Sequence, residues 1–439
     1  MLLGGRVKTL HPTIHGGILA RGEIDDDGLA ANGIERFDLV VCNLYPFGET
    51  VGAGNATESE IIEKIDIGGP AMIRAAAKNH HHVGVVVSPD QYHDVAESIE
   101  NGGLSPEQRR RLAAEAFFHT ASYDAAVVGW IGDDRVIPLR EVSSLRYGEN
   151  PHQTATLYRE DGAEPWWALA TLHQGKEMSF NNYADAEAAW RLATDLGPDA
   201  VVVVKHTNAC GAARGGTVLS TFEKAWDGDS LAAFGGVIGI NGALDASTAE
   251  AIGQRFVEVV VARSVDPDAL EVLSAKQNLR VLSAPEPSSG GDDYRRVDGG
   301  LLVQSRDSFD GETWETVSER APTDGELRAL EFAWIVAAHT KSNAVVLAGG
   351  EQAVGVGAGD QSRVGAAERA VAKAGGRARG AVAASDAFFP FRDGLDALAK
   401  AGVTAVVEPG GSRNDQELID AANEHGIALV FTGERHFRH

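Results

Sequence analysis

Short apolar runs rich in β-branched residues recur along the chain, and the typical run stops at glycine, proline, asparagine or aspartate before an alanine-rich stretch with helical spacing. Six runs stand out, at residues 38–43, 82–88, 200–205, 344–348, 404–408 and 428–432. Uninterrupted apolar runs are typical of strands buried on both faces. Their alternation with helices predicts an α/β fold.

The spacing of polar and apolar residues also predicts how the chain is organised. Residues 105–128 are rich in alanine, arginine and glutamate and predict one long helix. The polar segment that follows leads to Pro138, where we place a domain boundary, giving domains 1–138 and 139–439. The Gly/Ser-rich residues 284–293 indicate a surface loop in the second domain. No short internal repeat is apparent.

Composition narrows the function classes. The 439 residues carry a formal net charge of −24, which argues against a nucleic-acid binder or a protein of anionic membrane surfaces. Only 10 of the 39 basic residues are lysines, which favours a high-salt cytoplasm, with ordinary drift of an acidic surface as the alternative. No apolar run is long enough to span a bilayer and no secretory signal is visible, so we expect a cytoplasmic protein. The two cysteines, Cys42 and Cys210, cannot form a zinc site or a disulfide framework, and we expect both to be packed.

Reactive side chains stand where the predicted strands end, which is where open α/β sheets bind ligands. The run 200–204 leads directly to Lys205 and His206, an ammonium and an imidazole side by side. Taken alone, this pair is equally consistent with a solvated lysine and a packed histidine.

Other strand ends and loops offer anion-binding and aromatic groups. Arg146 lies in the turn-rich segment 146–152, and the Gly-rich loop 355–363 ends at Arg363. That loop matches neither a P-loop nor a dinucleotide fingerprint, which disfavours a nicotinamide oxidoreductase. Residues 385–393 place three aromatic rings between carboxylates, an arrangement that suits a flat heterocycle bearing amino groups but is also common in cores. The cationic end, 435–439, indicates an anionic ligand.

The first domain has its own cluster of reactive residues. Lysine, tyrosine and aspartate side chains there are suited to acid–base chemistry, and Arg6 with Thr9 is suited to holding a phosphate. His80, His81 and His82 resemble a metal-binding tract, but no carboxylate or cysteine stands at ligand spacing nearby, so we expect no metal site.

Taken together, these strings resemble the bifunctional purine-biosynthesis family of AICAR formyltransferase and IMP cyclohydrolase. The matching segments occur in family order: 5–12, 15–21, 43–47, 66–69, 145–152, 205–206, 341–343, 385–393 and 435–439. One such segment would be weak evidence, whereas the collinear set spans almost the whole chain.

For the second domain, the resemblance implies transfer of a formyl group from 10-formyltetrahydrofolate to AICAR, giving FAICAR, on two subdomains of cytidine-deaminase-like fold without zinc. It implies catalytic roles for His206 as general base, Lys205 as oxyanion stabiliser, and Asn343. The implied AICAR-binding residues are Arg146, Tyr147, Gly235, Glu258, Arg363, Phe388 and Arg435. The implied folate-binding residues are Val364, Asp393, Ser412 and Arg413.

For the first domain, the resemblance implies a methylglyoxal-synthase-like fold that closes FAICAR to IMP. The implied catalytic residues are Lys78, Lys8, Tyr45 and Asp66, and the implied nucleotide contacts are Arg6, Thr9, Asn43, Leu44 and Ile67. Family members carry further strand–helix units before residue 6, with two phosphate-binding loops that this sequence lacks. We therefore expect a truncated first domain, with cyclohydrolase activity dependent on whether the truncation is tolerated.

The resemblance further implies a homodimer with formyltransferase sites built across the subunit interface, and a potassium ion near those sites. Two alternatives remain open at this point. One is a formyltransferase that has lost the cyclohydrolase activity, and the other is a non-catalytic purine-nucleotide-binding protein.

Overall fold

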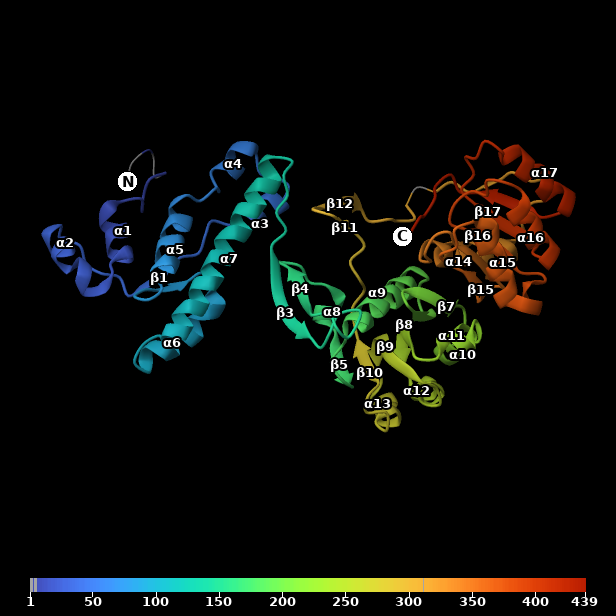
Figure 1. The fold of residues 1–439 in the computed structure, drawn as a ribbon, viewed down its shortest axis with the longest axis horizontal. Coiled ribbons are helices and arrows are strands. Elements are labelled where there is room, and N and C mark those ends of the chain that lie inside the picture. The colour runs from blue at the N-terminus through green and yellow to red at the C-terminus, as the bar shows by residue number, and fades with distance from the viewer. Residues whose placement is uncertain (1–2, 4–5, 311) are drawn as a thin grey trace. The chain divides into compact units, whose positions relative to one another are not determined.

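The computed structural model describes residues 3, 6–310 and 312–439, and the chain divides into two compact units (Figure 1). The first unit comprises 1–143 and 157–163, and the second comprises 144–156 and 164–439. The strands β3 (Leu139–Leu145) and β4 (Ala155–Glu160), where the chain passes between the units, form a two-stranded sheet. The assignment of a separate activity to each side of Pro138 stays a prediction.

The first unit is built around two short parallel strands, β1 (Leu39–Val41) and β2 (Gly84–Val86). Its helices are α1 (Pro12–Leu19), η2 (Gly22–Asp25), α2 (Asp26–Ala31), α3 (Phe47–Gly52), α4 (Glu58–Ile62), α5 (Gly68–Lys78), η3 (Pro89–Gln91), α6 (Tyr92–Glu100) and α7 (Pro106–Ile131). The predicted long helix is confirmed as α7. It begins with a capping box in which Ser105 and Gln108 satisfy each other's backbone N–H groups, and Pro106 occupies the first turn.

The second unit contains two six-stranded sheets with the same topology. In order across each sheet, the strands are β5-β10-β9-β8-β6-β7 and β13-β18-β17-β16-β14-β15. The bounds in the first sheet are β5 (Thr171–Gln174), β6 (Val201–Lys205), β7 (Asn208–Ala213), β8 (Gly236–Leu244), β9 (Val257–Val265) and β10 (Arg280–Ser283). Those in the second are β13 (Glu315–Thr316), β14 (Val345–Ala348), β15 (Ala353–Gly357), β16 (Val382–Ser385), β17 (Ala405–Glu408) and β18 (Ala428–Phe431). In both sheets three parallel strands are flanked by antiparallel ones, so the unit repeats one architecture twice.

Helices cover both faces of each sheet. They are α8 (Trp166–Leu169), α9 (Phe180–Asp195), α10 (Val218–Asp227), α11 (Ser230–Ala233), α12 (Ala246–Gly253), α13 (Pro267–Leu273), α14 (Asp324–Ala338), α15 (Arg363–Ala374), η4 (Gly375–Ala378), α16 (Asp393–Ala401) and α17 (Asp415–His425). A shared core joins the inner face of each sheet to α9 and α14. The outer faces pack against α10, α12 and α13 in the first sheet and against α15, α16 and α17 in the second.

The predicted α/β class is confirmed, and the burial of a single strand, β6, shows why its sequence is apolar throughout. In β6, Val202 and Val204 join the shared core, whereas Val201 and Val203 join the outer core of the first sheet. All four side chains are at most 1% exposed. A strand buried on both faces has no polar side to alternate with, which is why its sequence is an uninterrupted apolar run.

One hairpin stands outside these layers. The strands β11 (Asp292–Val297) and β12 (Gly300–Ser305) pair only with each other among the strands of the described residues (Figure 1). Leu301, Leu302 and Val303 are 45%, 58% and 42% exposed. Within the part of the chain that the structure describes, no helix is both long and apolar enough to cross a membrane.

Candidate functional site

A cavity of about 490 Å³ opens beside the second sheet, among the loops that follow β15 and β16 and the C-terminal segment. Its lining residues are Asn343, Gln361, Ser362, Arg363, Val364, Ala387, Phe388, Pro390, Phe391, Asp393, Arg435 and Phe437. Six of them are site residues predicted from the sequence. The cavity thus brings together residues that lie up to 94 positions apart, from Asn343 to Phe437.

Arg363 is the first residue of α15 and organises the polar side of this cavity. Its buried guanidinium forms an ion pair with Asp386, and it donates 2.8 Å to the side-chain oxygen of Asn343. The Asn343 amide in turn donates 2.9 Å to the carbonyl of Asp360. Because both ends of the Asn343 amide are held, its orientation toward a ligand is set before binding.

A cation and aromatic rings form the rest of the wall. The Arg435 guanidinium lies 4.5 Å from the centre of the Phe437 ring. Among the described residues no carboxylate forms an ion pair with Arg435, so its charge is available to an anionic ligand. Phe388 and Phe391 line the same cavity and offer apolar surface to a flat ring.

Two further predicted residues lie in a loop beside this wall without lining it. Ser412 and Arg413 follow β17, and the Ser412 backbone N–H donates 2.8 Å to Asp415. The neighbouring Asn414 donates 2.8 Å to the carbonyl of Pro390, which does line the cavity.

The predicted catalytic pair occupies a strained turn in the first sheet. Lys205 ends β6, Asn208 begins β7, and the two connecting residues, His206 and Thr207, both have left-handed backbone, with φ of 54° and 60°. Two-residue hairpins require this geometry but normally use asparagine and glycine for it. For a β-branched residue such as Thr207 it is costly, and strain of this kind clusters at functional sites.

Asp185, on α9, holds this turn in place, and nothing in the sequence pointed to it. Its carboxylate accepts 2.7 Å from the backbone N–H of Thr207 and also accepts from that of His206. Burial raises the pKa of Asp185, and these two donors partly offset the effect. The carboxylate therefore supports the turn that presents His206.

The other residues predicted to bind nucleotide lie around this turn. The Lys205 ammonium donates 2.9 Å to the carbonyl of Phe234, whose neighbour Gly235 has φ of 73°. Glu258 accepts 3.0 Å from Asn182. Burial lowers the pKa of Arg280, the nearby Glu258 charge opposes this, and the Arg146 charge adds to it.

Arg146 stacks on Tyr147, with its guanidinium 4.5 Å from the ring centre and 2.7 Å from the hydroxyl. Neither this group nor the pair Lys205 and His206 lines the cavity of the second sheet. The hydrogen bond from the Lys341 backbone N–H to Asn208, 3.0 Å long, connects the two regions. Within one chain the predicted formyltransferase residues therefore form two groups.

In the first unit, four predicted residues gather at the start of α5. Asp66 accepts 2.8 Å from the backbone N–H of Gly69, and Ile67 precedes the helix. A Cβ atom on Gly69 would lie 2.7 Å from Leu44, and one on Gly68 would lie 2.4 Å from the Thr9 hydroxyl. Glycines at both positions therefore allow these side chains to close around the helix start.

The remaining residues predicted in this unit are more dispersed. Arg6 pairs with Glu63 at 3.2 Å, and Asn43 accepts 2.9 Å from the Tyr92 hydroxyl. Lys8 and Tyr45 are exposed. Lys78 ends α5, about 15 Å along the helix from its start, so the structure does not place it beside Asp66. Gly5 of the matching sequence segment lies outside the described residues.

The histidine and cysteine side chains are the remaining candidates for metal ligands and nucleophiles. His80 and His81 stack with ring centres 4.5 Å apart, and no group of three or more His, Cys, Asp or Glu side chains suited to a metal occurs among the described residues. Both cysteines are free, and Cys210 is buried as predicted, with its pKa raised to about 11 mainly by burial.

Comparisons with known proteins give a consistent family. Residues 76–373 match the family model described as the AICARFT/IMPCHase bienzyme. The bifunctional purine biosynthesis protein PurH of Myxococcus xanthus is 48% identical over all of this chain and 89% of its own length, and that of Acidithiobacillus ferrooxidans is 49% identical over all of this chain and 88% of its own. The solved structure titled "Crystal structure of ForH" is 45% identical over 29% of this chain and 67% of its own, with a TM-score of 0.26.

The family model covers more than half of the chain, and the relatives match along its full length. The predicted resemblance is thus confirmed, and the chain belongs to the AICARFT/IMPCHase bienzyme family.

Proposed function

We propose that this protein transfers the formyl group of 10-formyltetrahydrofolate to AICAR, giving FAICAR, and closes FAICAR to IMP. The observation that carries the transferase assignment is the pairing of a strained turn that presents Lys205 and His206 with a separate anion-binding, aromatic cavity. The match of this whole chain to bifunctional relatives supports the closure of FAICAR to IMP.

In the transfer step, the 5-amino nitrogen of AICAR attacks the formyl carbon, and the bond from that carbon to N10 of the folate breaks. His206 accepts the proton that the amine loses, and Lys205 stabilises the negative charge that develops on the formyl oxygen. The proton then goes to N10, so that tetrahydrofolate and FAICAR leave. The amine is a poor nucleophile, which makes exact placement of both substrates as important as the proton transfer.

The residues around this step divide into two binding roles. The residues that hold AICAR are Arg146, Tyr147, Gly235, Glu258, Asn343, Arg363, Phe388 and Arg435. The Arg435 cation, which has no carboxylate partner in the described part of the chain, lies on the phosphate of AICAR. Val364, Asp393, Ser412 and Arg413 contact the folate. Two subdomains of cytidine-deaminase-like fold provide this scaffold, a proposal supported by the identical strand order of the two sheets.

The two groups of transferase residues complete one site when two chains associate. Within one chain, Lys205 and His206 do not line the cavity that contains Arg363 and Arg435. The exposed hairpin β11–β12 offers leucines at 45% and 58% exposure to a second copy of the chain. An isolated hairpin is marginally stable in water, so coverage by a partner also accounts for its order.

In the first unit, which has a methylglyoxal-synthase-like fold, Lys8, Tyr45, Asp66 and Lys78 carry the cyclisation, and Arg6, Thr9, Asn43, Leu44 and Ile67 contact the nucleotide. The gathering of Thr9, Leu44 and Asp66 at the start of α5 supports this, since it brings three of these residues together. We place the protein in a salt-rich cytoplasm, in keeping with its charge of −24, with potassium as the prevailing cation.

The experiment that tests the transferase assignment compares Lys205→Ala and His206→Ala with the parent chain, measuring tetrahydrofolate release and AICAR binding. Loss of a general base or an oxyanion donor lowers turnover by about 10²- to 10⁴-fold. We expect this loss with AICAR affinity largely retained. Lys400→Ala and His425→Ala, on α16 and α17, are the matched controls. Unchanged turnover in both site variants would exclude the assigned roles.

A further inference from the structure

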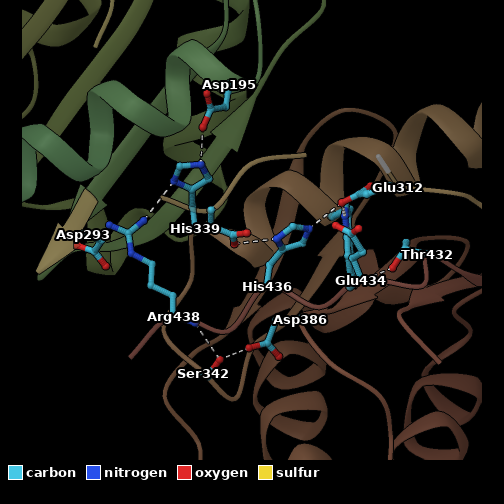
Figure 2. Close-up of polar contacts among 12 residues, drawn as sticks. Asp195, Asp293, Glu312, His339, Ser342, Asp386, Thr432, Glu434, His436 and Arg438 are labelled. Atoms are coloured by element: carbon cyan, nitrogen blue, oxygen red, sulfur yellow. Dashed lines mark hydrogen bonds and ion pairs between the residues drawn. The ribbon is translucent and has the colours of Figure 1, made fainter. Parts of the chain in front are cut away.

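The C-terminal tail, residues 434–439, alternates between the cavity and the interior of the second unit. Arg435 and Phe437 line the cavity, whereas the intervening His436 is 2% exposed. Arg438 follows the same alternation and contacts His339 at 3.2 Å (Figure 2). The tail therefore has one face that lines the cavity and another that packs into the unit.

His436 is the strongest of these anchors. Its Nδ1 lies 2.7 Å from the Asp307 carboxylate and its Nε2 lies 2.7 Å from that of Glu312. Because each ring nitrogen faces an acceptor, both carry a proton and the ring is an imidazolium. Burial by itself lowers the pKa of His436, but the hydrogen bonds and charges of Asp307 and Glu312 outweigh it and raise the pKa to about 9.

The carboxylate of Glu312 is itself fixed by two tryptophans. Trp334 donates 2.8 Å to one of its oxygens, and Trp314 donates 2.9 Å to the other. Trp334 is on α14, is 1% exposed, and packs edge-on against the His436 ring at 5.2 Å. His436 thus ties the tail to the shared core between the two sheets.

Backbone contacts transmit this anchoring to the cavity wall. The His436 N–H donates 3.0 Å to the carbonyl of Asp386, whose carboxylate pairs with Arg363. On the other side of Phe437, the backbone N–H of Ser342 donates 2.8 Å to the carbonyl of Arg438. Figure 2 shows the side chains of His436 and Arg438, with those of Asp386 and Ser342 below them.

We propose that His436 is a positioning residue that fixes the tail so that Arg435, supported by the Phe437 ring, meets the anionic part of the nucleotide. This inference rests on the proposed function and extends it to a residue that does not touch substrate. Arg435 is exposed and has no carboxylate partner among the described residues, and the ring that it contacts, Phe437, belongs to the same tail, so neither fixes where its charge lies. The neighbouring buried imidazolium does.

The test is a double-mutant cycle on the full chain that measures KM for AICAR and kcat. Arg435→Ala removes the cation itself. We expect His436→Gln to raise KM about tenfold with kcat within about threefold of the parent, because the loss is in binding. The double variant should be no worse than Arg435→Ala alone, since His436 acts through Arg435.

Asp307→Asn is a milder variant that guards against misfolding, since it removes one half-exposed carboxylate and leaves Glu312 and the tryptophans intact. It should also raise KM for AICAR, by a smaller factor than His436→Gln does. His425→Gln, a surface histidine paired with Asp396, is the matched control and should leave KM unchanged.

The proposal would be overturned if KM for AICAR were unchanged in both His436→Gln and Asp307→Asn. It would also be overturned if the rise in KM of the double variant equalled the product of the rises in His436→Gln and Arg435→Ala. A parent chain that binds no AICAR and releases no tetrahydrofolate would instead overturn the proposed function. The two failures are therefore distinguishable.

Discussion

At the scale of single residues, the turn that we propose to be catalytic depends on a carboxylate outside it. His206 and Thr207 adopt a backbone that costs about 1–3 kcal/mol per residue. Asp185 offsets part of this cost by accepting from the turn's N–H groups. The chain maintains the strain in order to project the side chains of Lys205 and His206 from the strand end.

Asp185→Ala should therefore lower kcat by about tenfold, because the turn relaxes and the reacting groups lose their alignment. Asp185→Asn keeps an acceptor for the Thr207 N–H and should recover most of the activity. Steady-state kinetics of both variants checks this. Equal losses in the two would show that the negative charge, and not the hydrogen bond, is what matters.

A second buried carboxylate controls stability. Glu408, at the end of β17, is fully buried, and one oxygen accepts 2.6 Å from the Phe389 N–H while the other has no hydrogen-bond partner among the described residues. Burial raises the pKa of Glu408 to about 8. The folded state therefore holds a proton that the unfolded state releases above its ordinary pKa of 4.5.

Because the folded state binds the extra proton between pH 4.5 and 8, this group makes stability fall as the pH rises through that window, by up to about 1.4 kcal/mol per pH unit. Glu408→Gln should remove this contribution. As the pH is raised from 5 to 8, the midpoint temperature of thermal unfolding of the variant should therefore rise relative to that of the parent. A constant difference between the two midpoints would contradict the assignment.

The residues that could be predicted from sequence are those with their own chemistry. Lys205, Asn343, Arg363 and Arg435 stand in recognisable strings, and the structure places the last three around one cavity. Asp185 and His436 act through backbone hydrogen bonds and buried charge pairs. Such contacts join positions far apart in the chain, and no local pattern records them.

At the scale of elements, close packing of helices on edge strands is set by glycine. A Cβ atom on Gly211 of β7 would lie 1.9 Å from the Ala225 carbonyl of α10. In the second sheet, a Cβ atom on Gly357 of β15 would lie 2.0 Å from the Ala366 carbonyl of α15. The two sheets use the same device at the corresponding strand.

Gly357→Ala should therefore destabilise the second unit by at least about 1–3 kcal/mol, because the obstructing atom belongs to the helix backbone. Gly253→Ala, on α12, meets no atom within 4 Å and should be neutral or slightly stabilising. Thermal unfolding of both variants checks the contrast. Equal midpoints would mean that α15 can shift away without cost.

The elements differ in how far sequence predicts them. The six apolar runs all form strands. Five of these strands are buried on both faces, which explains their uninterrupted apolar pattern, whereas Val41 in β1 is 52% exposed. The duplication of the sheet was not visible as a repeat, since strand order follows from pairing between segments and the two sheets use different residues. The hairpin β11–β12, exposed on both faces, overlaps the end of the predicted loop 284–293.

At the scale of the whole molecule, charge and association are linked. Each chain carries a net charge of −24, so two copies repel each other in dilute buffer. Molar salt shortens the screening length from about 10 Å at 0.1 M to about 3 Å. The proposed dimer should therefore be favoured by salt.

Leu302→Lys, on the exposed hairpin, should shift the chain toward monomer and lower formyl transfer in parallel, because the site that we propose needs residues from both chains. Light scattering and activity measured over a dilution series in molar potassium chloride check this. Ile24→Lys, at a 78% exposed position of the first unit, is the control. A fully active monomer would contradict the shared site.

The most direct test of the account is a paired assay of the 439-residue chain with AICAR and 10-formyltetrahydrofolate in molar potassium chloride, following tetrahydrofolate and IMP separately. We expect tetrahydrofolate release that depends on AICAR, with IMP forming as FAICAR is closed. Release without IMP would confine activity to the second unit. No AICAR-dependent release would contradict the central claim.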